Sequence, residues 1–444
     1  MSPHADPAGH FREVATAHSR CFWLDGGGAR EWSGRRSIIG WLEDDAVSLT
    51  YDAARREVRR HRGTGSSEVV GDDVFAVLEA ELAAGDPSDQ WFGYFGYACR
   101  PDLPALPDDR LPDAVWMRAS HVRQFEHPAE PDREDAAPGG REPPPPLVPR
   151  SGGASPSHRP PGASVPRAAA NVPADYGRAF DQVREQLLAG NSYEVNLTYR
   201  LDTAGDVDPV AAYLRLRELN PAPYAGFLQH DVPGHRAWLL SSSPERYALV
   251  TADRMLETKP IKGTTPRGHS AAEDAELRER LATEPKFRAE NLMIVDLLRN
   301  DLSMVCEPGT VEVPVLMEVE SYETVHQLVS TVRGRLRDDV TTMGALRALF
   351  PAGSMTGAPK LRTMRIIEDV EATPRGAYAG AFGWIAADGR ADLGVVIRSL
   401  MTGGEGGYRL GTGGGITVHS DVAEEYAESR WKAERLLRVF DHDG

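Results

Sequence analysis

The segment TKPIKGTTPRG, residues 258–268, contains a lysine where a ligand could approach. Lys262 follows an apolar Pro260-Ile261 step and precedes Gly263, whose missing side chain lets a backbone or ligand come close. A lysine in a polar loop is usually a solvated surface charge. If Lys262 instead points into a site, the loss of water would lower its pKa and make the amine a nucleophile.

Charged residues at helical spacing near the C-terminus could bind a cation. Glu425, Glu428 and Lys432 are three and four residues apart, so they lie on one face of a predicted helix that Asp421 would cap. Charges at this spacing usually form a solvated, ion-paired stripe. The alternative is a magnesium site, because Mg²⁺ takes one or two protein carboxylates together with water and substrate oxygens. Lys432 could then hold a substrate carboxylate.

Three more titratable side chains have both a structural and a chemical interpretation. Glu290 begins the strongly apolar segment ENLMIVDLLRNDL, where it either complements the helix dipole or serves as a ligand. Glu245, in SSSPERY, precedes a predicted strand and could be a general acid, a cap or a surface residue. His326 lies in the apolar run ETVHQLV, where a hydrogen-bonded core histidine is the more common outcome.

The elements that must position these residues fall into two parts. Residues 127–173 are crowded with Pro, Gly, Ser and charge, which predicts a disordered linker or a long surface loop. Residues 1–126 are strand-rich with one helix. Residues 174–444 contain helices at 175–190, 209–220, 290–302, 359–371 and 422–440 between meandering strands, and residues 321–336 are expected to form a strand pair. Without a regular βαβ alternation, this order predicts an α+β fold with large antiparallel sheets.

Composition limits the function classes. A chain of 444 residues that is 41% hydrophobic can bury a sizeable core, while a net charge of −16 argues against nucleic acid as a partner. Local Lys and Arg would have to hold an anionic small molecule. There is no signal pattern and no apolar run of about 18–20 residues, which predicts a cytoplasmic protein without a membrane partner. The three cysteines are far apart, which predicts reduced thiols and no zinc site.

Seven motifs taken together resemble the chorismate-utilising enzymes. In order, they are SSSPER, KPIKGTTPRG, ENLMIVDLLRNDL, PAGSMTGAPK, IRSL, GTGGGIT and EEYAESRWK. The resemblance is dense from residue 174 to the C-terminus and thinner over residues 1–126. It implies two large antiparallel sheets in a β-sandwich core, helices on the outside and an active site in a cleft. Both parts would supply strands, so residues 127–173 would be an insertion within one fold.

Carried over residue by residue, the resemblance implies a magnesium-dependent site for chorismate. Glu290 and Glu428 would bind Mg²⁺, with Glu425 close by, and the ion would hold the ring carboxylate. Glu245 would protonate the departing C4 hydroxyl. The other implied substrate contacts are Arg398, Lys432, Tyr378 and the backbone of Gly413, Gly414 and Gly415 at the enolpyruvyl carboxylate, and Thr264 and His326 along the ring.

Two positions separate the family members. Family members that use water as the nucleophile carry a lysine at the position that Glu194 occupies in YEVNLTY. The glutamate therefore argues against an isochorismate or salicylate synthase. The lysine of PIKGT is typical of aminodeoxychorismate synthases, whereas anthranilate synthases carry PIAGT. The resemblance therefore implies that Lys262 attacks C2 as the C4 hydroxyl leaves, and that ammonia then adds at C4. The product would be 4-amino-4-deoxychorismate, the precursor of p-aminobenzoate in folate biosynthesis.

Two alternatives stay open, and a partner is implied. Anthranilate synthase component I is the second candidate and a non-catalytic relative the third. None of Cys21, Cys99 and Cys306 has the setting of a glutaminase nucleophile, so ammonia would come from solution or from a separate glutamine amidotransferase subunit. Ala222, in NPAPY, stands where anthranilate synthases regulated by tryptophan carry serine, which argues against feedback by tryptophan.

Overall fold

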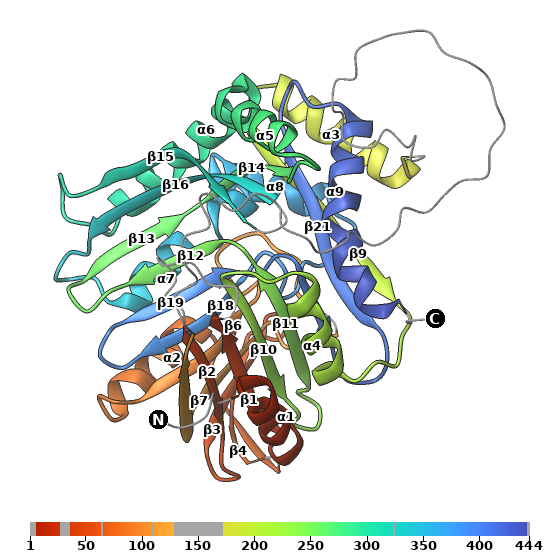
Figure 1. The fold of residues 1–444 in the computed structure, drawn as a ribbon. Helices are drawn as coiled ribbons and strands as arrows, with labels where there is room; N and C mark the ends of the chain where they lie inside the picture. The colour runs from red at the N-terminus through yellow and green to blue at the C-terminus, as the bar shows by residue number, and fades with distance from the viewer. Residues whose placement is uncertain are drawn as a thin grey trace, which may run out of the picture.

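The computed structural model describes residues 6–26, 36–63, 65–108, 110–127, 172–322 and 325–441. It confirms the α+β class with two large antiparallel sheets (Figure 1). Each sheet contains strands from before residue 127 and from after residue 172. Nearly all of the predicted linker lies outside the described residues, so that prediction and the domain boundaries drawn from it stay untested.

The first sheet has nine strands, and every neighbouring pair in it is antiparallel. In spatial order they are β17 (Gly357–Ala358), β9 (Glu194–Thr203), β21 (Tyr408–Ile416), β20 (Ser399–Thr402), β11 (Ala237–Ser243), β10 (Tyr224–His230), β1 (Arg20–Asp25), β2 (Arg36–Trp41) and β8 (His121–Glu126).

The second sheet has twelve strands, again all antiparallel. Its order is β14 (Ile261–Pro266), β16 (Val325–Arg335), β13 (Met255–Lys259), β12 (Arg246–Val250), β19 (Ala391–Val395), β18 (Ala381–Ala386), β6 (Gln90–Phe95), β7 (Ala114–Arg118), β3 (Val47–Asp52), β4 (Glu57–Arg62) and β5 (Ser66–Gly71), with β15 (Glu312–Ser321) also paired to β16.

Helices cover the outer faces of both sheets. The first sheet carries helices from both ends of the chain: α1 (Pro7–Ala17), α3 (Ala174–Leu188), α4 (Pro209–Leu219), α8 (Lys360–Val370) and α9 (Val422–Leu437). The second sheet carries α2 (Val74–Ala84), α5 (Ala271–Thr283), α6 (Pro285–Ser303) and α7 (Thr342–Leu349).

The two sheets pack face to face, as the alternation along β1 illustrates. Phe22 points into the core between the sheets and stacks on Phe92 of β6, with ring centroids 3.8 Å apart. Its neighbours Cys21 and Trp23 point to the opposite face, where they pack with Phe11 of α1. Successive side chains of a strand face opposite sides, so one strand supplies two cores.

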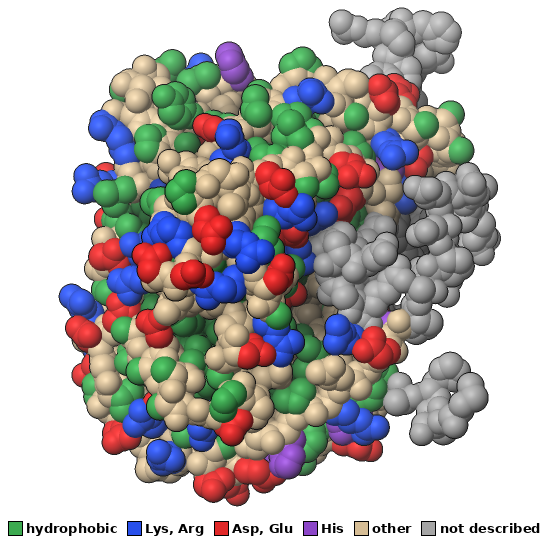
Figure 2. Space-filling model, turned by 90° about the vertical axis from the view of Figure 1, so that its left-hand side faces the viewer, with side chains coloured by type: hydrophobic (Ala, Val, Ile, Leu, Met, Phe, Trp, Pro, Cys, Tyr) green, Lys and Arg blue, Asp and Glu red, His purple; other side chains and the backbone are tan. Residues whose placement is uncertain are grey.

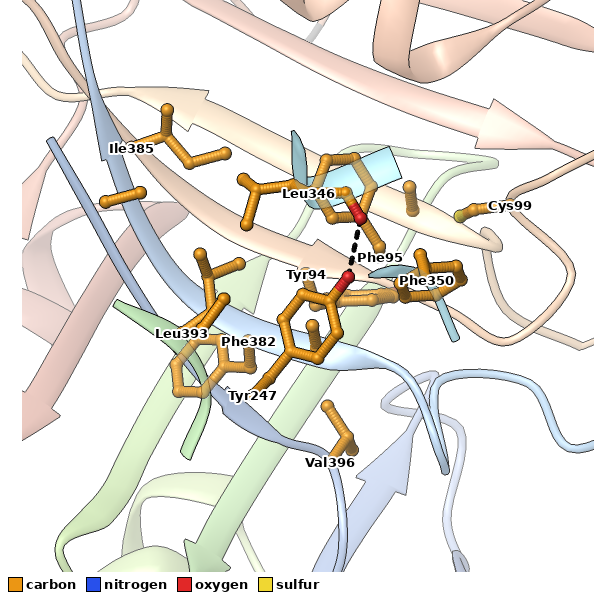
Figure 3. Close-up of a cluster of buried hydrophobic side chains, with 14 of the residues drawn as sticks. Tyr94, Phe95, Cys99, Tyr247, Leu346, Phe350, Phe382, Ile385, Leu393 and Val396 are labelled. Atoms are coloured by element: carbon orange, nitrogen blue, oxygen red, sulfur yellow. Dashed lines mark hydrogen bonds between the residues drawn. The ribbon is translucent and has the colours of Figure 1, made fainter. Parts of the chain in front are cut away.

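The larger core continues from the second sheet to α7 (Figure 3). Tyr247 of β12 lies among Phe350, Phe382 and Leu393, and its hydroxyl donates a 2.6 Å hydrogen bond to the carbonyl oxygen of Leu346. A buried tyrosine hydroxyl needs such a partner. This bond fixes the start of the strand that follows Glu245.

The five predicted helices of the C-terminal part are confirmed, but one strand prediction was wrong. Residues 321–336 were predicted to form a strand pair. They instead contribute one long strand, β16, whose partner β15 comes from the preceding residues. β15 alternates between exposed and half-buried side chains and contains two register shifts, so its pattern gives a weak strand signal.

The surface is mixed in charge on the face that Figure 2 shows, where Lys and Arg side chains alternate with Asp and Glu. Ion pairs exposed at the surface of the protein include Arg333–Glu312 and Arg337–Asp339. None of the helices in the described part of the chain combines the length and the apolar character needed to cross a membrane.

Candidate active site

A cavity of about 150 Å³ opens between α6, α9 and the ends of strands from both sheets. Twelve of the thirteen side chains or glycines predicted for the site line it, together with several residues that were not predicted. The predicted residues in its wall are Glu245, Lys262, Thr264, Glu290, Tyr378, Arg398, Gly413, Gly414, Gly415, Glu425, Glu428 and Lys432, leaving His326 outside.

Lys262 enters the cavity from β14, the edge strand of the second sheet, and forms an ion pair with Glu194 of β9 in the first sheet. The Glu194 side chain is buried, and the lysine is mostly buried. Burial alone would lower the pKa of Lys262, but the carboxylates of Glu194, Glu290 and Glu245 outweigh it, so the pKa is raised. The amine therefore rests in its charged form.

Glu245 lies in the turn between β11 and β12, fully surrounded by protein. Burial raises its pKa to about 7, against the opposing effects of Ser354, Lys262 and Arg398. Ser354, in the 3₁₀ turn Gly353–Met355, donates a 2.6 Å hydrogen bond to Glu245 Oε1. A carboxyl group with this pKa is protonated in a large fraction of molecules near neutral pH, as a general acid requires.

Helix α9 presents its predicted charged face to the cavity, where Glu428 is also exposed to solvent. Lys432 Nζ lies 2.7 Å from Glu428 Oε1 and 3.3 Å from the Gly413 carbonyl oxygen. Asp421 caps the helix through the backbone N–H groups of residues 423 and 424, as predicted. Glu425 accepts hydrogen bonds from Ser420 at 2.8 Å and from Lys286 at 3.3 Å.

Lys286, at the start of α6, is a cavity residue that the sequence analysis missed. Burial would lower its pKa, but Glu425, Glu290 and Glu428 raise it. One lysine therefore compensates part of the charge of three carboxylates. Its position one turn before Glu290, on the same helix, could have suggested this role.

The acidic residues of this wall suit a magnesium ion. Among the described residues, no three His, Cys, Asp or Glu side chains form a ready metal cluster, but Mg²⁺ needs only one or two carboxylates besides water and substrate oxygens. Burial raises the pKa of Glu290 to about 7, and Glu425 adds to the shift. A half-buried carboxylate crowded by another is a group that a cation would stabilise.

Arg398 brings a positive charge to the far wall of the cavity, between β19 and β20. Burial, together with the nearby charge of Arg435, lowers its pKa to about 10. Its backbone has φ of +50°, a strained conformation for a residue with a side chain. A desolvated guanidinium held in strained backbone is suited to a carboxylate ligand.

Tyr378 is held in the wall by a buried ion network. The Arg200 guanidinium lies 4.9 Å above its ring, and Arg200 pairs with Glu371. Arg375 also pairs with Glu371 and donates hydrogen bonds to the carbonyl oxygens of Met355 and Asn196, which line the cavity. This network therefore joins three walls of the site.

The glycines of GTGGGIT leave room for neighbouring side chains. A Cβ on Gly415 would lie 2.0 Å from Glu194 Oε1 and 3.2 Å from Lys262 Nζ, so only glycine fits beside that ion pair. A Cβ on Gly411 would lie 2.2 Å from the Tyr378 ring. Gly414 is less restricted, because its nearest neighbour would be Glu425 Oε2 at 3.3 Å.

His326 is not brought to the cavity, and its neighbour Gln327 is. The two His326 ring nitrogens lie 2.7 Å from Ser321 Oγ and 3.0 Å from Asp274 Oδ1. Gln327 is 1% exposed, and neither polar atom of its side chain has a hydrogen-bond partner among the described residues. On β16 these two residues face opposite sides, and Gln327 pairs with Thr264. Thr264 was predicted, so this alternation could have identified Gln327.

Comparison with known proteins identifies the family of the chain. Over residues 19–438 the sequence matches the family described as chorismate binding enzyme. The chain belongs to this family. Aminodeoxychorismate synthase from Streptomyces pristinaespiralis is 41% identical over 98% of this chain and 63% of its own length. Aminodeoxychorismate synthase component 1 from Klebsiella aerogenes is 42% identical over 60% of this chain and 58% of its own.

The fold of this family member also matches a solved structure. The anthranilate synthase component I of Streptococcus pneumoniae superposes with a TM-score of 0.70 and 25% sequence identity, covering 91% of this chain and 92% of that one. Our chain spans only about three fifths of the lengths of the two relatives named above, 63% and 58%.

Proposed function

We propose that this chain converts chorismate and ammonia to 4-amino-4-deoxychorismate and water. The observation that carries the proposal is the meeting of Lys262 and Glu245 in one cavity with Arg398 and Lys432. Two cations in one cavity suit a carboxylate of the substrate, while an amine and a protonated acid in the same cavity suit displacement of a hydroxyl.

The proposed reaction has two displacements. Lys262 Nζ, as the neutral amine, forms a bond to C2 of chorismate while the C4–O bond breaks, and Glu245 gives its proton to the leaving oxygen, which departs as water. Ammonia then forms a bond to C4, the bond between C2 and Nζ breaks, and the extra proton of the new amine returns to Glu245. Chorismate and ammonia thus give the amino product and one water.

The remaining residues would bind and orient the substrate. Arg398, Lys432 and the backbone of Gly413–Gly415 would hold the enolpyruvyl carboxylate, with Tyr378 beside it and Thr264 along the ring. Glu290 and Glu428, with Glu425 nearby, would hold Mg²⁺, which when bound supplies positive charge for the ring carboxylate. These three carboxylates line the same cavity, and a bound cation would offset their charge where an anionic substrate approaches.

The ammonia would come from solution or from a separate glutaminase subunit. Cys21, Cys99 and Cys306 are all buried, and burial raises the pKa of each thiol. A glutaminase nucleophile needs an accessible thiolate with a lowered pKa. The name of the Klebsiella relative, component 1, supports a partner subunit.

Product analysis tests the proposal. Purified chain with chorismate, Mg²⁺ and ammonium should form 4-amino-4-deoxychorismate, which an added aminodeoxychorismate lyase would convert to p-aminobenzoate. Anthranilate, detected by its fluorescence without the lyase, would instead identify the second candidate, anthranilate synthase component I.

Lys262→Ala tests the nucleophile. This variant should lose about 10²-fold or more of the C4-amination rate, and it recreates the PIAGT pattern, so residual activity could shift to C2. Quenched during turnover without ammonia, the wild type should carry chorismate less one water on the peptide that contains Lys262. If the alanine variant makes the C4 product at the wild-type rate, the covalent step is wrong.

A further inference from the structure

A buried carboxylate, that of Glu194, lies behind Lys262, and the proposed substrate contacts do not use it. Oε1 of Glu194 is the acceptor of the lysine's hydrogen bond, and no second acceptor for that amine lies among the described residues. The Glu194 side chain is 2% exposed. Its other oxygen, Oε2, is buried and has no hydrogen-bond partner among the described residues.

We propose that Glu194 is the base that takes the proton from Lys262 before the amine attacks. This inference rests on the proposed function, in which Nζ must be neutral to bond to C2. Glu194 touches the reacting nitrogen itself, so the role is catalytic. The proton moves from Nζ to Glu194 Oε1, and it returns to Nζ when the lysine is expelled in the second displacement.

The unpartnered oxygen favours this transfer. An ionised carboxylate can accept about four hydrogen bonds, and burying it with one oxygen unsatisfied is costly. The carboxylic acid form carries no net charge, so its unpartnered oxygen costs less. When a substrate displaces water from the cavity, the neutral pair of acid and amine becomes more stable relative to the ion pair.

Other charged groups reach Lys262 from several elements, but none replaces Glu194. Glu290 on α6, Glu245 before β12 and Glu428 on α9 act on its amine through space. Two of these would hold the cation and the third serves as the acid, and each belongs to a different element. On the cationic side, Lys286 faces Glu290 and Arg398 faces Glu245.

Gly415 supports the same assignment. Because Gly415 has no side chain, it leaves space for Glu194 Oε1, which a methyl group at this position would overlap. The backbone of β9 also orients the acid, because Ser192 Oγ donates a 2.8 Å hydrogen bond to the Glu194 carbonyl oxygen. The pair is therefore fixed from two strands, β9 and β21, before a substrate enters.

Glu194→Gln tests the proposal, because glutamine keeps the shape and a hydrogen-bond acceptor but cannot take a proton. The measurement is the rate of adduct formation on Lys262 after mixing with chorismate and Mg²⁺ without ammonia, by rapid quench and intact-protein mass spectrometry. We expect a loss of about 10²-fold or more at neutral pH. The remaining rate should rise with pH, since solvent hydroxide then removes the proton.

Competitive acetylation of Lys262 in the substrate-free protein adds a second readout. Loss of the Glu194 charge should lower the pKa of Lys262, so the amine of Glu194→Gln should label at lower pH than that of the wild type. If Glu194 is the base, the glutamine variant should contain more neutral amine than the wild type and still form the adduct more slowly. Faster adduct formation at neutral pH would overturn the proposal, because Glu194 would then only hold the lysine in its unreactive form.

The same experiments separate this inference from the proposed function. A wild type that forms no adduct would contradict the covalent mechanism itself, whatever Glu194 does. A wild type that forms the adduct and a glutamine variant that matches its rate would contradict only the role of Glu194. Glu194→Asp, which retains a carboxylate, should fold, react more slowly than the wild type and lack the steep rise with pH. A pH dependence like that of Glu194→Gln would count against the base.

Discussion

Ser354 Oγ donates a 2.6 Å hydrogen bond to Glu245 Oε1, and both residues line the cavity. The bond stabilises the carboxylate and so lowers its pKa, while burial raises that pKa to about 7. Ser354 therefore limits how far the pKa of Glu245 is raised.

Ser354→Ala should move the alkaline limb of the kcat profile to higher pH. Glu245 acts while it holds its proton, so its contribution is present below its pKa and is lost as the pH rises through about 7. Without the hydroxyl this pKa should rise, moving the limb by about 0.5–1 pH unit, equivalent to one hydrogen bond of about 1 kcal/mol. Steady-state rates at saturating ammonia, measured as a function of pH, would give the position of this limb.

Ser420→Ala provides the matched control, because Ser420 donates to a different cavity carboxylate, Glu425. It should leave the position of the limb unchanged. A limb that stays in place in Ser354→Ala, or moves to lower pH, would mean that another group limits the reaction at alkaline pH.

The residues that line the cavity could be predicted better from the sequence than the contacts that these residues make with one another. Lys262, Glu290, Arg398 and Glu428 come from four separate motifs, and family resemblance placed them in one cavity. Spacing alone could not, because the fold brings them together through strand pairings between distant segments. The pKa of Lys262 could not be predicted from the sequence, since it depends on the distance to Glu194, which lies on the other sheet.

The position of His326 outside the cavity has a simple physical origin. A strand turns neighbouring side chains to opposite faces, so an assignment that is one residue off selects the wrong face entirely. The pairing of Thr264 with Gln327 resolves it.

Gln327→Leu should therefore impair turnover more than His326→Asn does. The leucine removes two unpartnered polar atoms from the cavity wall, and the loss of one substrate hydrogen bond should lower kcat/KM by about tenfold. His326→Asn breaks bonds to Ser321 and Asp274 outside the cavity and should mainly lower the melting temperature. If kcat/KM falls only in the His326 variant, the assignment of Gln327 is wrong.

Glu290→Gln and Glu428→Gln should each reduce turnover by about 10²-fold or more without unfolding the protein. Each change removes one negative charge from the proposed Mg²⁺ site. Glu424→Gln is the matched control, because Glu424 is exposed on the same helix and does not line the cavity. Turnover measured as a function of Mg²⁺ concentration would show whether the two glutamates bind the ion. Full activity of Glu428→Gln in EDTA would exclude the metal role.

Glutamine alone should not support product formation by the purified chain. Its three cysteines are buried with raised thiol pKa values, so no thiolate is available for glutamine hydrolysis. Ammonium should replace glutamine, with a rate that increases at mildly alkaline pH where more free ammonia exists. Product formed from glutamine in ammonia-free buffer, without a second protein, would reveal an amidotransferase site in this chain.

Gly415→Ala should abolish turnover, whereas Gly414→Ala should be tolerated. The added methyl group at 415 would overlap Glu194 Oε1 at 2.0 Å and separate it from Lys262, while at 414 the nearest atom is 3.3 Å away. Circular dichroism would verify folding, and chorismate consumption would measure the effect. Equal activity of the two alanine variants would show that the Glu194–Lys262 contact is dispensable.

The order of strands in the larger sheet also constrains how the chain is made. β6 pairs with β18, so Phe95 meets Ala381, which leaves the ribosome hundreds of residues later. At about 5–20 residues per second, the delay is on the order of tens of seconds. During that time β6 exposes an unpaired edge beside the apolar ring of Phe92. We therefore expect the nascent N-terminal half to need protection from aggregation until β18 is made, and a chain that stops before β18 to keep this edge unpaired.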